Sequence, residues 1–310
     1  MLAAGVVLLT SIPTARAAAA EPTFVAPSPY VVAIDPGHGG SPTSDPTQLW
    51  DPGVVVGSVM EKDITLDLAM RLRKLLQRER VKVVLTRSGD QYVEISERWN
   101  RARAVGAKMF VSLHVNAYDG DPTINGLAVF YPKPDSFSFA QAIDAGLAQT
   151  LKRFQIADDG VAIKPELWVR TDIPTVTVEP AYLTNPRERT LLLQDDFREA
   201  IAMGVFQGML AADPEIEQTK VQLVHAEAAA TAQRVAAETA SSDAARVAAA
   251  TRWGLIIGGV AVLFLVMRAA IRRQSRLPEP PAWPLPIVPK LIRWFASSER
   301  ICVDTADAKL

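Results

Sequence analysis

Stretches of β-type pattern alternate with stretches of helical pattern between residues 30 and 212. Short runs rich in Val, Ile and Phe predict strands, and apolar residues spaced three and four apart predict helices with one face on a core. Strands are expected at 30–35, 81–86, 108–115, 127–131 and 175–179, and helices at 61–78, 94–105, 137–154 and 197–211. This order predicts an α/β fold, a single domain at 30–212 with a mixed, mostly parallel sheet covered by helices on both faces.

The hydrophobic pattern changes after residue 212. Residues 213–252 are dominated by alanine with scattered Glu, Gln and Arg, which is typical of a helix with little to bury, so we predict an Ala-rich helical stalk. The run at 253–271 is apolar on all sides apart from Arg268, whose charged end can reach the membrane surface. It predicts one transmembrane helix, and the alternative is a buried helix of a soluble protein.

The two ends of the chain predict the same topology. Residues 1–20 hold an apolar run followed by small residues and resemble a signal segment, although no basic residue precedes the run; a disordered Ala-rich leader is the alternative. Residues 21–29 form a Pro-rich linker. The Pro-rich tail at 272–310 begins with arginines, which favour the cytoplasmic side. We therefore predict a single-pass protein of the cytoplasmic membrane with the domain outside the cytoplasm and the C-terminus inside.

Composition narrows the range of partners. The chain has 33 Lys and Arg against 34 Asp and Glu, and no dense basic run precedes residue 267. Because a phosphate polymer is normally bound by a basic face, we predict no nucleic-acid partner. The single cysteine, Cys302, lies in the tail, so the domain cannot form an internal disulfide bond.

Two of the three histidines follow strand-like runs. His38 lies in the glycine-rich turn after VVAIDP, and His114 ends the apolar run MFVSLH. Open α/β sheets bind ligands at the carboxyl ends of their strands, so we expect the two imidazoles to converge. One histidine in such a turn is more often structural, but two in matching positions favour a metal site. The third, His225, lies in the stalk and is interpreted as a solvated side chain.

Two glutamates stand where a metal-assisted hydrolytic centre needs carboxylates. Glu61 begins a predicted helix, where an acid also suits the helix dipole. Two neutral imidazoles and one carboxylate suit a catalytic zinc ion whose fourth position is left for water. Glu179 ends a buried strand just before Pro180, where an acid either forms a salt bridge or takes part in chemistry. We interpret Glu179 as the group that moves protons.

Four further residues are interpreted as supporting groups. Ser112 and Asn116 lie two residues on either side of His114, on the same face of the strand, where they could orient the site. Arg87 and Arg98 are expected to fix the neighbouring loop and helix rather than to take part in chemistry.

The order of short motifs resembles that of a known enzyme family. The motifs are DPGHGG, DPG at 51–53, EKD at 61–63, VVLTR, SLHVNA, GLAVFY and VEPAYLTNP. In this order they resemble the zinc-dependent N-acetylmuramoyl-L-alanine amidases of the type 3 amidase family, over nearly all of the domain. The sequence departs from the family pattern at two places. About ten residues, 41–50, are inserted between GHGG and DPG, and the last motif reads EPAYLTN where the family more often has a glycine and a phenylalanine. Neither departure removes a ligand.

The resemblance implies that His38, Glu61 and His114 bind one zinc ion and that Glu179 is the catalytic acid/base. It also implies hydrolysis of the amide between N-acetylmuramic acid and L-alanine in peptidoglycan, for cell-wall remodelling or cell separation. The alternative is a noncatalytic peptidoglycan-binding membrane scaffold on an amidase fold, and a general metallopeptidase is a weaker third interpretation. The stalk offers a surface for an activator protein or another partner.

Overall fold

The computed structural model describes residues 27–41, 49–167 and 172–274 of the chain. The predicted signal-like segment, most of the predicted linker, and the tail beyond residue 274 with Cys302 lie outside these residues. Two compact units divide the chain, the first ending at Glu238 and the second beginning at Thr239. The first unit holds the sheet and the predicted site, and the described part of the second belongs to one helix.

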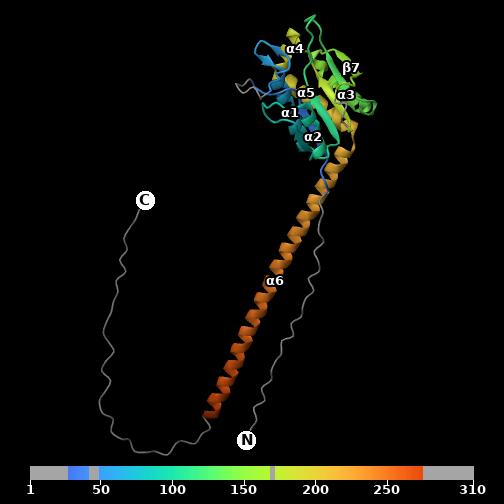
Figure 1. Cartoon of the computed structure of the whole chain (residues 1–310). Coiled ribbons are helices and arrows are strands. Elements are labelled where there is room, and N and C mark those ends of the chain that lie inside the picture. Colours follow the sequence, from blue (N-terminus) through green and yellow to red (C-terminus); the bar gives the residue numbers. More distant parts are fainter. Residues whose placement is uncertain (1–26, 42–48, 168–171, 275–310) are drawn as a thin grey trace, which may run out of the picture. The chain divides into compact units, whose positions relative to one another are not determined.

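A six-stranded sheet forms the centre of the first unit (Figure 1). Its strands are β1 (Val31–Pro36), β4 (Lys82–Leu85), β5 (Met109–Leu113), β6 (Leu127–Tyr131), β7 (Asp158–Ile163) and β8 (Thr175–Glu179). They are ordered β4-β1-β5-β8-β6-β7, and only the pairing of β6 with β8 is antiparallel. The predicted mixed, mostly parallel sheet is confirmed.

Helices cover both faces of the sheet, as predicted, but unequally. The helices are α1 (Glu61–Arg78), α2 (Ile95–Ala104), α3 (Phe137–Leu151), α4 (Pro186–Leu192) and α5 (Asp195–Ala212), with 3-10 turns η1 (Pro134–Ser136) and η2 (Lys152–Phe154) flanking α3. Side chains alternate along β1. Val32 and Ile34 join a large core with α1, α3 and α5, whereas Ala33 joins a small one with Trp99 of α2 and Phe110.

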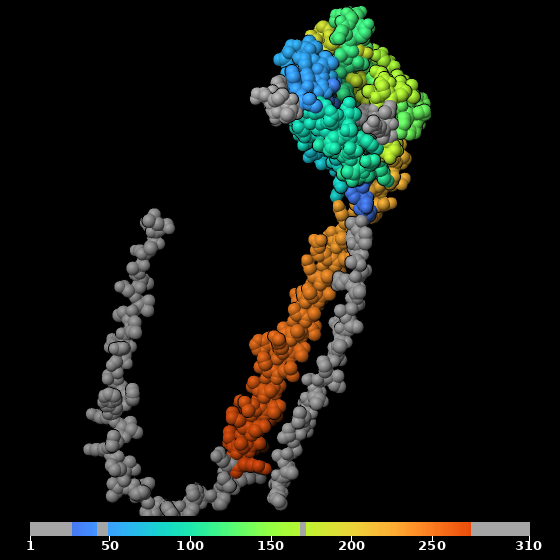
Figure 2. Space-filling model, in the orientation of Figure 1, coloured from blue at the N-terminus to red at the C-terminus, as the bar shows by residue number. Residues whose placement is uncertain are grey.

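The sequence pattern did not predict several short elements. β2 (Val55–Val56) and β3 (Val59–Met60) form a two-stranded hairpin within a small surface lobe (light blue in Figure 2). The edge strand β7 begins with Asp-Asp-Gly and is mostly exposed, so it has no hydrophobic period. The seven-residue helix α4 begins at the cap formed by Asn185, whose side chain accepts two backbone N–H groups. Such short elements depend on tertiary contacts more than on local pattern.

One continuous helix, α6 (Glu215–Gln274), covers the region predicted as stalk and span. It contains an 18-residue window with a mean hydropathy of 2.3, no part of which is buried, so by length and composition it can cross a membrane. The boundary between the stalk at 213–252 and the span at 253–271 stays a prediction.

The first turns of α6 pack within the first unit. Ile216 is fully buried in the large core, and Lys220 forms an ion pair of 2.6 Å with Glu79. A second ion pair of 2.6 Å joins Arg80 to Glu227. The packed core of the first unit therefore continues past residue 212 into the beginning of α6.

Three glycines allow α3 and α5 to approach closely. Gly146 lies on α3, and Gly204 and Gly208 lie four residues apart on α5. A Cβ atom at position 146 would lie 2.2 Å from the carbonyl oxygen of Gly204. Because that oxygen belongs to the backbone, it cannot move without shifting the helix.

We expect Gly146→Ala to destabilise the domain by about 1–3 kcal/mol, because overpacking would separate α3 from α5. At an exposed helical position the same change would stabilise by about 1 kcal/mol, since alanine is the better helix former. Chemical unfolding of the purified full chain in mild detergent measures the difference. Ala145→Gly, at the exposed neighbouring position, gives the size of the propensity effect, and a gain in stability for Gly146→Ala would contradict the packing argument.

Candidate metal centre

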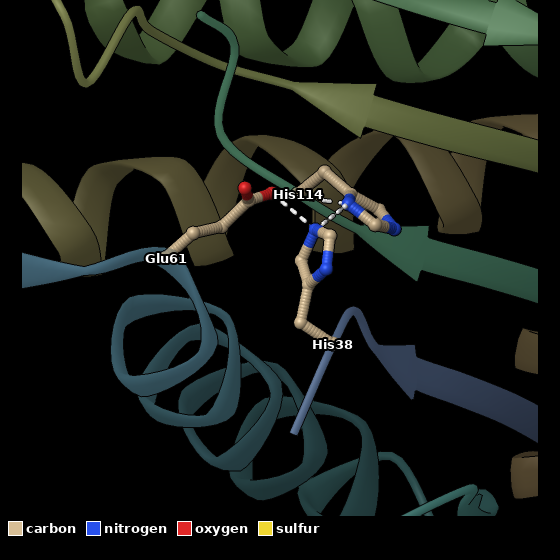
Figure 3. Close-up of side chains that lie close together, drawn as sticks. All are labelled: His38, Glu61 and His114. Carbon is tan, nitrogen blue, oxygen red and sulfur yellow. Dashed lines mark hydrogen bonds and ion pairs between the residues drawn. The ribbon is translucent and has the colours of Figure 1, made fainter. Parts of the chain in front are cut away.

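Three candidate ligands approach one point from three separate elements (Figure 3). His38 lies in the turn after β1, Glu61 is the first residue of α1, and His114 directly follows β5. Strands β1 and β5 are parallel neighbours with Pro36 opposite Leu113, so the two histidines leave the sheet at the same edge. The structure thus brings together the three residues that the sequence pattern selected.

Two glycines leave the space in which the candidate ligands meet. A Cβ atom at Gly37 would lie 2.4 Å from Cε1 of His114, and one at Gly53 would lie 2.6 Å from Oε2 of Glu61. Larger residues at these two positions would push the candidate ligands apart. His38 itself adopts a φ of 60°, a left-handed conformation that is uncommon outside glycine and is found most often at functional turns.

The three ligand atoms form a compact triangle. Nε2 of His38 lies 3.1 Å from Oε1 of Glu61, and Nδ1 of His114 lies 3.0 Å from the same oxygen and 3.1 Å from Nε2 of His38. Metal–ligand bonds of about 2.0–2.1 Å in tetrahedral geometry place ligand atoms about 3.3 Å apart. These three residues therefore fit a single metal ion that keeps one position open.

Backbone hydrogen bonds fix the carboxylate of Glu61. Its Oε1 accepts the N–H of Val115 at 3.0 Å, and its Oε2 accepts the N–H of Val54 at 3.0 Å. Only 3% of the residue is exposed. A ligand held from both oxygens before any ion arrives loses little conformational freedom on binding.

Asp51 is a functional candidate that our reasoning from the residues missed. Its Oδ1 lies 2.8 Å from Nδ1 of His38 and also accepts the N–H of Gly53 at 3.1 Å. A carboxylate on the far nitrogen fixes the tautomer and orientation of a metal-binding imidazole. The motif DPG marked this position in the sequence, but only the folded structure shows that it meets His38.

Two buried arginines hold the turn that carries His38. Arg87 donates hydrogen bonds to the carbonyl groups of Pro36 and Gly37 and to that of Lys62 in α1. Arg98 donates to the carbonyl groups of Pro36 and His38. These contacts agree with the prediction that the two arginines fix the backbone near the site, and that they take no part in chemistry stays a prediction.

A buried carboxylate, Asp35, neutralises Arg98 beneath the site. It lies 2.9 Å from the guanidinium of Arg98 and accepts the hydroxyl of Ser112 at 2.7 Å. Ser112 therefore supports β1 rather than touching the candidate ligands. The side chain of Asn116 accepts the N–H of Ala117 in its own turn. The predicted orienting roles of Ser112 and Asn116 stay predictions.

The electrostatic coupling of the three ligands favours a bound cation. Burial alone would raise the pKa of Glu61, but hydrogen bonds and charges from His114 and His38 hold it well below its usual value. Burial alone would lower the pKa of His114, but the hydrogen bond to Glu61 and the charge of Glu179 raise it to about 9. A proton and a metal ion therefore compete for His114, so metal affinity should rise with pH.

Glu179 ends β8 beside this triangle. It lines a pocket of about 320 Å³ together with His38 and His114. Burial raises the pKa of its carboxyl to about 7, and its Oε2 is buried without a hydrogen-bond partner among the described residues. A carboxyl group at a pocket wall with such a raised pKa can exchange a proton with a bound molecule near neutral pH.

The fold and the triangle of donors define an α/β protein with a candidate site for one metal ion at the carboxyl edge of its sheet. Residues 32–211 match the family described as N-acetylmuramoyl-L-alanine amidase, and the chain belongs to this family. The family membership that the motifs predicted is confirmed.

Curated relatives match the same region. The chain is 30% identical over 183 residues to the probable cell wall amidase LytH of Staphylococcus epidermidis. The aligned region covers 57% of this chain and 56% of that protein. It is 29% identical over 185 residues to the N-acetylmuramoyl-L-alanine amidase LytC of Bacillus subtilis, with 58% and 35% covered. The chain therefore spans only part of the length of these relatives.

Solved structures share the fold. The catalytic domain of the amidase CwlV from Bacillus (Paenibacillus) polymyxa var. colistinus has a TM-score of 0.53 and 30% identity, covering 59% of this chain and 97% of that one. The amidase AmiC2 of Nostoc punctiforme also has a TM-score of 0.53 and 30% identity, with 59% and 96% covered. The matched part of the chain thus corresponds to almost the whole of these catalytic structures.

We expect Asp51→Asn to weaken metal binding about 10- to 100-fold, because His38 would lose the carboxylate that fixes its orientation. Calorimetric titration of zinc into the chelator-treated full chain measures this change. The matched control is Asp119→Asn at an exposed position, which also removes one negative charge. Equal affinities for the two variants would show that Asp51 contributes only its charge.

Glu179 should make stability depend on pH. Its folded pKa of about 7 lies above the ordinary value of 4.5, so between these pH values the unfolded chain ionises this carboxyl in water while the folded protein keeps it protonated. Stability from this group therefore falls as the pH rises from about 4.5 to 7, and above pH 7 the folded protein holds the charge away from water. With chelator present, Glu179→Gln should be more stable than the parent at pH 8, and the difference should shrink as the pH falls to 5. Thermal unfolding at the two pH values measures the effect, and a difference independent of pH would contradict the assignment.

Proposed function

We propose that this chain is a zinc-dependent enzyme that hydrolyses the amide between the lactyl group of N-acetylmuramic acid and L-alanine in peptidoglycan. The observation that carries the proposal is the triangle of His38, Glu61 and His114 beside Glu179, whose Oε2 has no hydrogen-bond partner among the described residues. Two imidazoles and a carboxylate are a donor set typical of catalytic zinc. The family to which the chain belongs indicates which bond is cleaved, because its relatives are named N-acetylmuramoyl-L-alanine amidases.

In this proposal each residue has one task. His38, Glu61 and His114 hold the ion, and Asp51 keeps Nε2 of His38 directed toward it. When bound, zinc polarises a carbonyl group and lowers the pKa of water. Glu179 takes a proton from the attacking water and returns it to the leaving amine of L-alanine, and a pKa of about 7 suits both transfers near neutral pH.

We also propose that the catalytic domain acts outside the cytoplasm and is anchored by the apolar part of α6. The cell-wall substrate requires that location. The arginines Arg268, Arg272 and Arg273 close the apolar run and favour a cytoplasmic C-terminus by the positive-inside rule. The presence of all four site residues favours an enzyme over a noncatalytic scaffold.

Digestion of purified peptidoglycan by the full chain in mild detergent tests the proposal. We expect mass spectrometry to detect free stem peptides and intact glycan strands. Release should stop with a chelator and return when zinc is added, because the ion is required for attack on the amide. Cleavage of glycosidic or peptide bonds instead would contradict the assigned bond, and release that is insensitive to chelation would contradict the metal.

Two substitutions separate metal binding from proton transfer. Glu179→Ala should retain zinc and lose turnover by at least about 100-fold, in line with the loss of a general acid/base. His114→Ala should lose both zinc and turnover. Metal content and peptide release are measured on the same preparations, and metal-dependent turnover in Glu179→Ala at the parent rate would remove its assignment.

A further inference from the structure

The pocket beside the candidate metal centre extends to a lysine at its other end. Thr177 and Glu179 lie on one face of β8, and Phe130 of β6 is paired with Thr177. Ala162 of β7 is paired with Phe130, and Lys164 lies two residues later, on the same side of the chain. Phe130, Lys164, Thr177 and Glu179 all line the pocket. A row of residues across three strands therefore leads from the proposed acid/base to Lys164.

The position of the ammonium group of Lys164 is defined by two contacts. Its Nζ lies 3.5 Å from the centre of the Phe130 ring, a cation–π contact. The backbone of Lys164 is held as well, because its N–H donates a hydrogen bond of 2.9 Å to the carbonyl of Tyr131 at the end of β6. The charge thus lies over the pocket wall rather than in bulk solvent.

Lys164 differs from the other cation of the pocket wall in its partners. Arg98 is paired with buried Asp35 and donates to backbone carbonyl groups, so its charge and donors are already used. Within residues 27–41, 49–167 and 172–274, Lys164 forms no ion pair with a carboxylate. Glu166 and Glu179 also line the pocket, and the charge of Lys164 acts on Glu179, but neither acid forms an ion pair with it among the described residues. The described pocket wall therefore presents one lysine whose ammonium group can take a further carboxylate.

We infer that Lys164 binds a carboxylate on the peptide side of the substrate, on the residue that follows L-alanine. This inference rests on the proposed function. The only carboxyl group of the muramoyl sugar is part of the bond to be cleaved, so a free carboxylate can come only from the peptide. An ammonium group of this kind forms a charge-assisted hydrogen bond with such a carboxylate.

The spacing of the pocket agrees with that position in the peptide. Thr177 lies about 7 Å from Glu179 along β8, and Phe130, on the neighbouring strand about 4.8 Å to the side, lies about 8 Å from Glu179. An extended peptide covers about 3.3–3.6 Å per residue, so about two residues bridge this distance. A peptide that runs from the scissile amide at Glu179 along β8 toward Thr177 would carry its second residue toward the ammonium over Phe130.

Two muramoyl peptides test the inference, identical except that the residue after L-alanine has a free carboxylate in one and a carboxamide in the other. The full chain should cleave the carboxylate substrate with about tenfold higher kcat/KM. Lys164→Gln should abolish this preference by lowering kcat/KM for the carboxylate substrate about tenfold more than for the carboxamide, and Lys164→Arg should keep most of the preference. Lys152→Gln, at an exposed position, controls for the loss of one positive charge.

A binding measurement keeps the inference separate from the proposed activity. Calorimetric titration of both peptides into the Glu179→Gln chain requires no turnover, and Lys164→Gln in this background should remove the preference for the carboxylate. If the parent chain cleaves neither peptide but the Glu179→Gln chain binds the carboxylate peptide more tightly through Lys164, the proposed function fails and the inferred carboxylate site stands. Binding that does not depend on the carboxylate or on Lys164 overturns the inference, as does a Lys164→Gln variant that keeps the parent's ratio of kcat/KM between the two substrates. A change common to both substrates is set apart by this ratio, because the charge of Lys164 also acts on Glu179.

Discussion

The site depends on the hydrogen bonds that two buried guanidinium groups donate to the turn after β1. That turn leaves the sheet to bring His38 toward Glu61 and His114, and the carbonyl groups of Pro36, Gly37 and His38 accept hydrogen bonds from side chains. Buried carbonyl groups without partners are costly. Arg87 and Arg98 satisfy them, and Arg87 also reaches the first turn of α1, which carries Glu61. The same interactions therefore fix two of the three candidate ligands.

These arginines bring a cost of their own, because two positive charges are buried close together. Burial, followed by the charge of Arg98, lowers the pKa of Arg87 to about 10, while Asp35 acts in the opposite direction. Asp35 is fully buried and contacts Arg98, Thr86 and Ser112. The compensating carboxylate explains why polar Ser112 occupies the strand position opposite Asp35, whereas the preceding pair, Ile34 and Val111, faces the large apolar core.

The unequal covering of the two faces separates stability from chemistry. Three helices close one face over the large core, and α2 alone packs on the other, against Ala33 and Phe110. Residues farther along the same face, such as Thr177 and Phe130, are left to line the pocket. Because the closed face holds the sheet together, the open face can carry Glu179, whose Oε2 has no hydrogen-bond partner among the described residues, and Lys164, which forms no ion pair with any of them.

The sequence by itself determined the α/β class, most of the long elements and the residues His38, Glu61, His114 and Glu179. Those residues stand at the ends of strong apolar runs or at the start of a clearly periodic helix, where pattern and chemistry are local. Only the tertiary structure decided that Asp51 meets His38, that the carboxylate of Glu179 is buried, and that Lys164 reaches the same pocket. These relations join residues distant in sequence through strand pairing and loop packing, and neither leaves a periodic signal in the chain.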